Sequence, residues 1–153
     1  MTRQLATLEN LDGAAIREVV PHRPPFLFLD RILTCVPGQF ARSTWRIPED
    51  AFFVAGHFPG RPIVPGVLLL EMAAQTACFA MASREMAEGI YLLVRVSEAT
   101  FSRQVRPGED VTTEAKLARQ VEQFSIFSCE SRSGEQRVAK AELLVALSKQ
   151  GSS

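Results

Sequence analysis

The feature that most constrains the fold is a long apolar segment near the middle of the chain, residues 67–82, in which only Glu71, Gln75 and Thr76 are polar. An apolar run of this length indicates a helix, and a helix that is apolar on nearly every side must be covered by the rest of the chain. The run is shorter than the roughly 20 residues of a membrane span and contains polar side chains. We therefore expect a buried central helix, running to about residue 87, and no membrane segment.

The rest of the chain contains segments that can cover this helix as strands. Apolar or alternating stretches occur at 26–36, 41–47, 92–96, 111–117, 121–129 and 139–147, and Pro-Gly or Ser-Gly turn signals stand at 37–38, 107–108 and 133–134. A short helix over 14–20, capped by Asp12, precedes them. The pattern predicts an α+β chain in which an antiparallel sheet wraps one central helix. We expect a single domain over 1–153, with 1–12 and 149–153 as flexible termini.

Charge and cysteine content exclude several classes of partner and site. The 17 basic and 17 acidic side chains cancel, so no overall field favours nucleic acid or an anionic membrane. The three cysteines are odd in number and widely spaced, which fits neither a disulfide framework nor a metal site. With no apolar signal-peptide core at the N-terminus, we expect a cytoplasmic protein without metal.

A loop at 48–66 directly precedes the central helix and is a candidate functional segment. It holds four of the nine prolines and three of the nine glycines, which exclude regular structure. His57 stands in this loop, and histidine is the usual proton acceptor at physiological pH. The unpaired backbone N–H groups near Gly66 and Val67, at the positive end of the helix dipole, can stabilise an oxyanion.

Glu71 lies about one and a half turns inside the predicted helix, where burial disfavours its ionised form and allows it to donate a proton. Gln75, four residues on, shares its helical face and can orient the carboxyl group by a hydrogen bond. A base, an acid and an oxyanion site within fifteen residues suit removal of a proton beside a carbonyl and loss of a β-substituent. This chemistry requires no cofactor.

The same residues also allow purely structural interpretations. A loop histidine can be a turn residue, and a buried glutamate can simply satisfy a polar neighbour. His22, in the stiff turn before Arg23, Pro24 and Pro25, is interpreted as structural, and the cysteines as small core residues. Tyr91 opens a strand and either packs in the core or lines a pocket.

Four segments of the sequence carry a family resemblance: PHRPPFLFLDRI (21–32), GHFPGRPIVPGVLLLEMAAQ (56–75), FSRQVRPGEDV (101–111) and SGEQRVAKAELLVAL (133–147). Together they resemble the 3-hydroxyacyl-acyl carrier protein dehydratases of type II fatty acid synthesis, over about residues 16–147. The second segment is the most specific, because it spaces the histidine and the glutamate as that family does.

The resemblance implies a hot-dog fold and a homodimer with two sites at its interface, often assembled into a hexamer as a trimer of dimers. His57 of one subunit would then face Glu71 of the other. In the implied reaction His57 removes the C2 proton of a (3R)-3-hydroxyacyl thioester, the Gly66 N–H polarises the thioester carbonyl, and Glu71 protonates the departing hydroxyl. The product is a trans-2-enoyl thioester, and a glutamate instead of an aspartate at position 71 favours plain dehydration.

Further residues are expected to contact the substrate or its carrier. Val67, Gln75, Phe58 and Tyr91 are candidates for substrate binding beside Gly66. Because acyl carrier protein is acidic, a basic rim is needed at the mouth of the acyl tunnel, and Arg95, Arg103 and Arg106 are the candidates. Arg95 stands where the family usually has a small glycine, and Pro24, Gln104 and Met72 also depart from its pattern.

Two other functions compete with dehydration. A hot-dog thioesterase would hydrolyse the thioester with a carboxylate and water, and the histidine in GHFPG argues against it. A non-catalytic acyl-binding subunit of a heteromeric dehydratase is the second alternative, and the presence of both His57 and Glu71 disfavours it.

Overall fold

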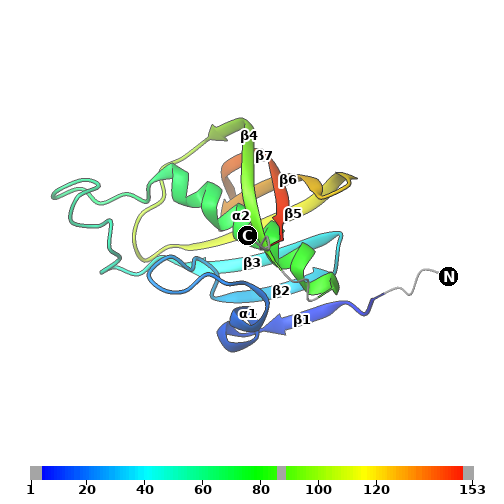
Figure 1. Cartoon of the computed structure of the whole chain (residues 1–153). Helices are drawn as coiled ribbons and strands as arrows, with labels where there is room; N and C mark the ends of the chain where they lie inside the picture. Colours follow the sequence, from blue (N-terminus) through cyan, green and yellow to red (C-terminus); the bar gives the residue numbers. More distant parts are fainter. Residues whose placement is uncertain (1–4, 86–88, 150–153) are drawn as a thin grey trace.

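The structure, a computed structural model, describes residues 5–85 and 89–149 (Figure 1). Seven strands and two helices make up the described chain, and their order is β1 (Leu8–Leu11), α1 (Gly13–Val19), β2 (Arg31–Val36), β3 (Phe40–Arg46), α2 (Gly66–Glu85), β4 (Ile90–Phe101), β5 (Asp110–Val121), β6 (Phe124–Ser133) and β7 (Gln136–Ser148).

All seven strands form one antiparallel sheet in the order β1-β2-β3-β5-β6-β7-β4. The sheet curves around α2, which contacts β3, β4, β5, β6 and β7 (Figure 1). A long helix wrapped by a single antiparallel sheet is the hot-dog fold. The predicted fold class is therefore confirmed.

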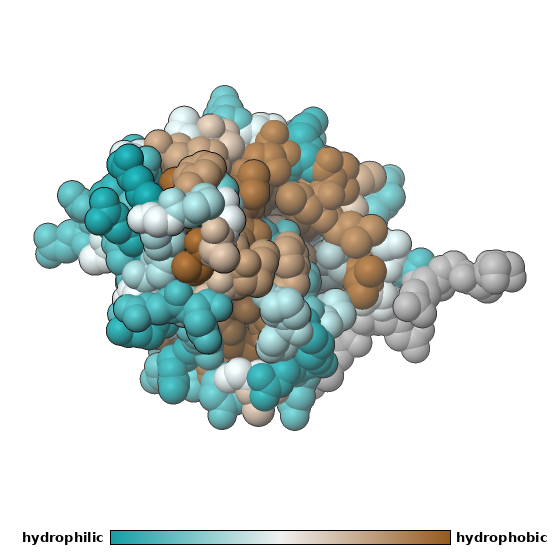
Figure 2. Space-filling view, turned by 90° about the vertical axis from the view of Figure 1, so that its left-hand side faces the viewer, coloured by the Kyte–Doolittle hydropathy of each residue, from teal (hydrophilic) through white to brown (hydrophobic). Residues whose placement is uncertain are grey.

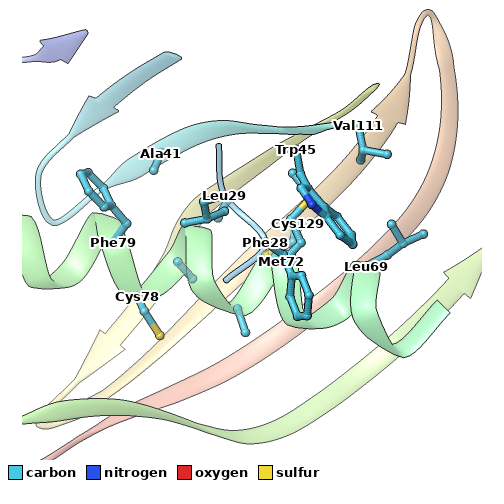
Figure 3. Close-up of a cluster of buried hydrophobic side chains, with 14 of the residues drawn as sticks. Phe28, Leu29, Ala41, Trp45, Leu69, Met72, Cys78, Phe79, Val111 and Cys129 are labelled. Carbon is cyan, nitrogen blue, oxygen red and sulfur yellow. The ribbon is translucent and has the colours of Figure 1, made fainter. Parts of the chain in front are cut away.

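The core lies between α2 and the inward-facing side chains of the sheet (Figure 3). Met72 and Phe79 on the helix are fully buried, as are Val111 and Phe127 on the strands. The rings of Phe28 and Trp45 lie 4.8 Å apart and extend this core beneath the segment after α1. By length and composition α2 could span a membrane, but 67% of it is buried inside the protein, as expected for a core helix.

Small hydroxyl side chains occupy several inward positions of the sheet and satisfy one another. Ser43 lies 2.7 Å from Thr76 of α2, and Thr113 lies 2.6 Å from Ser131, measured between hydroxyl oxygens. These four side chains are buried. Paired hydroxyl groups avoid the cost of unsatisfied buried polar atoms. Because they are polar residues at inward-facing positions, they also interrupt the apolar alternation of strands such as β6.

Every predicted element is present, but several bounds differ: β2 begins at Arg31 and not at residue 26, and β4 and β6 extend further than predicted, to Phe101 and Ser133. Asp12 caps α1 by accepting the Ala15 N–H over 3.0 Å, and the predicted hairpin around the turn at 37–38 is formed by β2 and β3. The expected helix end at residue 87 falls outside the described residues. One expectation is wrong: part of the stretch 1–12 is not a loose terminus, because Leu8–Leu11 forms β1 and pairs with β2.

The edge strand β4 is unusual because apolar side chains on both of its faces are exposed in the single chain. Ile90, Leu92, Leu93, Val94, Val96 and Phe101 are between 36% and 53% exposed. β4 bonds to β7 on one side only. Figure 2, the side of the molecule at the left of Figure 1, also shows a broad hydrophobic area. Exposed apolar area on a free sheet edge is typical of a surface that pairs with another chain.

Candidate active site

The loop between β3 and α2 holds its shape through its own backbone hydrogen bonds. Phe58 and Arg61 exchange two of them, N–H to C=O, over 3.1 and 2.9 Å. The Val64 N–H donates to Val105 C=O over 2.7 Å and fastens the end of the loop to the segment that follows β4. The loop has no helix or strand, as predicted, yet it is a defined scaffold for His57.

His57 is joined to Ile63 at both its backbone and its ring. Its carbonyl accepts the Ile63 N–H over 2.9 Å, and its Nδ1 lies 3.0 Å from the Ile63 carbonyl oxygen. A carbonyl oxygen only accepts, so Nδ1 carries the hydrogen and Nε2 of the neutral ring carries the lone pair. The His57 ring stacks on Phe58, with centroids 4.2 Å apart. The geometry therefore leaves Nε2 as a base.

The first residues of α2 lie beside His57 in an open groove of about 530 Å³, which is also lined by Phe101 and Arg103. Among the described residues, the backbone N–H groups of Gly66 and Val67 donate no hydrogen bond. The groove thus combines a base with two free donors at a helix N-terminus. Such donors suit a carbonyl oxygen that gains negative charge.

Glu71 and Gln75 form the second part of the candidate site. Gln75 is fully buried, its Nε2 donates to Glu71 Oε1 over 3.1 Å and to Phe26 C=O over 3.1 Å, and its Oε1 accepts the Phe28 N–H over 2.9 Å. These backbone partners fix which end of the amide faces Glu71. The predicted hydrogen bond is confirmed. Glu71 itself is less buried than expected, with 22% of its side chain exposed in the single chain.

A small cavity of about 100 Å³ lies near Glu71 on the same side of α2. His22, Cys78 and Tyr91 line it, and Tyr91 also packs against the hydrophobic core, so both alternatives given for it apply. The Cys78 thiol donates to Tyr91 C=O over 3.7 Å, and burial, reinforced by the charge of Glu71, raises the pKa of the Cys78 thiol to about 12. This cysteine is therefore an unreactive lining residue.

The two parts of the site face different sides of α2. At 3.6 residues per turn, Glu71 lies about 140° around the helix from Gly66. Gly66 and Leu69 line the groove of His57, whereas Cys78 and Ala82 line the small cavity on the Glu71 side. Within the described residues of one chain, no hydrogen bond or ion pair joins His57 to Glu71. One chain therefore presents a base with an oxyanion site, and separately an oriented acid.

The predicted carrier-binding arginines are distributed unevenly. Arg103 Nη2 lies 2.9 Å from Glu109 Oε1, so much of its charge is already neutralised. Arg106 is exposed and lines a second open groove of about 410 Å³ together with Arg61 and Glu49. Arg95 lies mid-way along the exposed edge strand β4. Arg61 was not predicted as a site residue, although it stands in the same Pro- and Gly-rich loop as His57.

Phe101 was also missed as a site residue. Its ring lines the His57 groove, and a Cβ atom built on Gly66 would approach its Cε1 to 2.9 Å. A glycine at the helix start therefore allows the ring to lie close against the groove. Phe101 opens the segment FSRQVRPGEDV, which was quoted only as part of a resemblance, and nothing in its spacing pointed to this contact.

Comparison with known proteins connects this geometry to a reaction. Residues 20–142 match the family model described as a FabA-like domain. The chain is 36% identical over 138 residues to the 3-hydroxyacyl-acyl-carrier-protein dehydratase FabZ of Desulforamulus reducens, which covers 90% of this chain and 97% of that protein. It is 32% identical over 150 residues to the FabZ of Shewanella loihica, covering 95% and 96%.

A solved structure supports the fold independently. The dehydratase heterocomplex ApeI:P from Xenorhabdus doucetiae contains a chain that superposes with a TM-score of 0.77, over 88% of this chain and 91% of that one, at 15% sequence identity. Similarity at this level of identity concerns the fold. It places the same hot-dog architecture around a central helix in both proteins.

Proposed function

The chain belongs to the FabA-like family, and from this membership we propose that it is a hydro-lyase that dehydrates 3-hydroxyacyl-acyl carrier protein to trans-2-enoyl-acyl carrier protein. The observation that carries this assignment is the match to curated dehydratases along nearly the full length of both chains. The match is not limited to one short motif, because it includes the loop of His57 and the part of α2 that carries Glu71.

We assign the removal of the C2 proton to His57, whose Nε2 bears the free lone pair. The electrons of the C2–H bond form the C2=C3 double bond, and the C3–O bond breaks. The departing hydroxyl takes a proton from Glu71 and leaves as water. The free N–H groups of Gly66 and Val67 stabilise the negative charge that develops on the thioester oxygen. Proton exchange with water then restores His57 and Glu71.

The orientation of Glu71 supports its role as the acid. Its Oε1 accepts the Gln75 amide N–H, so the proton of the neutral acid resides on Oε2. Among the described residues Oε2 has no hydrogen-bond partner. An acid held by one oxygen, with the other free to face the substrate, is oriented for proton donation.

We further propose that the complete site forms between two copies of the chain. His57 and Glu71 face different sides of α2, and the exposed apolar edge of β4 offers a surface that a second copy can cover. Two-fold pairing presents the same patch from both subunits and produces two equivalent sites. The homodimer is the minimal assembly with this property, and a trimer of dimers would preserve it.

Acyl carrier protein is the proposed partner that delivers the substrate. Of the predicted arginines, Arg106 is best placed, because it is exposed and lines an open groove together with a second arginine, Arg61. Arg103 is engaged by Glu109, and Arg95 lies on the strand proposed to pair with a second copy. Phe58 and Tyr91 are proposed to contact the acyl chain. The proposed location of this chemistry is the cytoplasm.

The test is conversion of a 3-hydroxyacyl group on acyl carrier protein, followed by intact mass and by a thiol assay on the same samples. Loss of one water without release of thiol is the expected result. Release of free thiol would instead identify a thioesterase. Binding of the acylated carrier with no change in its mass would identify a non-catalytic subunit.

A further inference from the structure

His22 lies against the carboxyl group assigned as the acid. Its Nε2 is 3.7 Å from Glu71 Oε1, the same oxygen that accepts the Gln75 amide over 3.1 Å. This distance is too long for a hydrogen bond, so the interaction between the two side chains is electrostatic. The side chains of His22 and Glu71 are only 20% and 22% exposed, so solvent screens the contact only in part.

The segment that carries His22 is held firmly in this position. The Arg23 guanidinium donates to the carbonyl oxygens of Arg17, Val20 and His22 over 2.7 to 2.9 Å. Downstream, Phe26 C=O and Phe28 N–H are bonded to the Gln75 amide. The same amide therefore orients Glu71 and anchors the backbone beside His22.

The other ring nitrogen of His22 is conspicuous because it has no partner. Nδ1 is buried and makes no hydrogen bond among the described residues, and His22 lines the small cavity with Cys78 and Tyr91. A buried ring nitrogen without a partner is unfavourable, and a role in the turn alone does not explain it. Such a role also does not explain why the other nitrogen lies 3.7 Å from a carboxylate. The arrangement instead suits a side chain that acts on Glu71.

We propose that His22 is a positioning residue for Glu71, which steadies the carboxyl group at the same oxygen as Gln75 and couples its protonation to the charge of the imidazole. This inference rests on the proposed function, because it concerns the acid of that reaction. It assigns a role to a residue that the sequence indicated only as part of a stiff turn.

Electrostatics around His22 agree with this role. The titratable and charged groups that face it are Glu18 of α1, Glu71 and Cys78 of α2, Tyr91 of β4 and the neighbouring Arg23. Burial lowers the pKa of His22, the charge of Glu71 acts to raise it, and Arg23 lowers it further, with a net pKa below the usual value. The imidazole is therefore neutral near pH 7.

At lower pH the coupling takes effect. A protonated His22 carries a positive charge 3.7 Å from Glu71 Oε1 and attracts the carboxylate. Because the interaction is reciprocal, Glu71 must affect the titration of His22 to the same extent. This reciprocity can be measured without substrate.

The first experiment is an NMR titration of the His22 ring in the wild-type protein, Glu71→Gln and Arg23→Lys. The chain has two histidines, so a His57→Asn variant assigns the signals. We expect the His22 pKa to fall in Glu71→Gln, because the attraction is lost, and to stay near wild type in Arg23→Lys, which keeps the charge. An unchanged pKa in Glu71→Gln, or an equal fall in Arg23→Lys, would overturn the proposal.

The second experiment is the pH dependence of kcat for His22→Lys and His22→Gln. A cation that persists at neutral pH should lower kcat at least about fivefold with a smaller effect on KM. The neutral glutamine should lose less of the rate at pH 7 than the lysine does, and it should remove the component of the acid limb that follows His22. Equal losses in both variants at every pH would show a structural role only.

The two experiments separate this inference from the proposed function. A wild-type protein that fails to dehydrate, yet shows a His22 titration that depends on Glu71, would contradict the reaction and keep the pairing. An active wild type in which the His22 titration does not change when Glu71 is replaced would contradict only the interaction between His22 and Glu71.

Discussion

The Gln75 side-chain amide donates to Glu71 Oε1 from one turn further along α2. The side-chain oxygen of the same amide accepts the N–H of Phe28, which lies 47 residues earlier in the chain. The amide connects a backbone segment to the acid and cannot reverse without breaking its contacts to Phe26 and Phe28. The orientation of Glu71 is thus determined by the hydrogen bonds of one buried amide, which a substitution at Gln75 removes together.

Gln75→Leu should lower both stability and turnover. It leaves the Phe28 N–H and the Phe26 carbonyl without partners, at about 1–3 kcal/mol for each group, so urea denaturation should show a loss of about 2–6 kcal/mol in the free energy of unfolding. Thr76→Val, which removes the hydroxyl bonded to Ser43, is the matched control on another face of α2. It should lose stability but keep kcat at a temperature where it is folded. Equal kcat in both variants would mean that Gln75 does not orient the acid.

Gly66→Ala should disturb the groove of His57 more than the stability of the chain. The added Cβ would lie 2.9 Å from the Phe101 ring, which is half exposed and can move. We expect kcat/KM to fall on the order of tenfold, and Phe101→Leu in the same chain to recover part of the loss. Gly13→Ala, where a Cβ would meet only the tip of Arg17 at 3.4 Å, should remain at the wild-type rate. No recovery in the double variant would disprove the steric explanation.

Glu109 should make folding stability depend on acid pH. Partial burial acts to raise the pKa of Glu109, but hydrogen bonds from Arg103, the Arg106 N–H and Ser133 outweigh it and hold the pKa below its usual value. A lowered folded-state pKa contributes stability that is complete above the unfolded value of about 4.3. This stability is lost as the pH falls through the folded value.

The corresponding measurement is the urea midpoint from neutral pH into this acid range. Glu109→Gln should be less stable than wild type at pH 7, and the difference should shrink as the pH falls. Glu114→Gln, which removes an exposed ion pair with Arg42, should stay close to wild type throughout. A constant difference between Glu109→Gln and wild type at every pH would contradict the linkage.

Charge reversal at the groove of Arg61 and Arg106 should weaken use of the protein carrier. We expect Arg61→Glu with Arg106→Glu to raise KM for the carrier-bound substrate on the order of tenfold. Turnover of a small 3-hydroxyacyl thioester should be unchanged. Arg119→Glu, at the far end of β5, is the matched control. An equal effect on both substrates would show damage to the catalytic site instead of lost recognition.

Much of the fold was predictable because local patterns determine it. The apolar run of α2, the alternation in β3, β5 and β7, and the Pro- and Gly-rich loop each follow from short-range chemistry. β1 was missed because Leu8–Leu11 is only four residues long and has polar residues at its centre. β6 was poorly patterned because Ser125 and Ser131 face the core, where apolar residues would have revealed the period.

The composition of the site was predictable, but its division into two parts was not. Spacing placed Gln75 beside Glu71, since residues four apart share a helical face. The approach of His22 to Glu71 depends on bonds between residues 26–28 and α2 across nearly 50 positions. The periodicity of a sequence indicates only local structure and cannot predict contacts between residues so far apart. The separation of His57 from Glu71 likewise follows from how the loop folds back onto the helix.

The most direct test of a site shared between two chains is complementation between inactive variants. His57→Ala and Glu71→Gln should each lose at least about a hundredfold in rate as separate proteins while remaining folded. When the two are co-expressed in equal amounts, half of the dimers are mixed, and each mixed dimer contains one site with both His57 and Glu71 intact. We predict recovery of about a quarter of the wild-type rate. Mixed dimers that remain as inactive as either parent would place both residues in the same chain's site and contradict the shared arrangement.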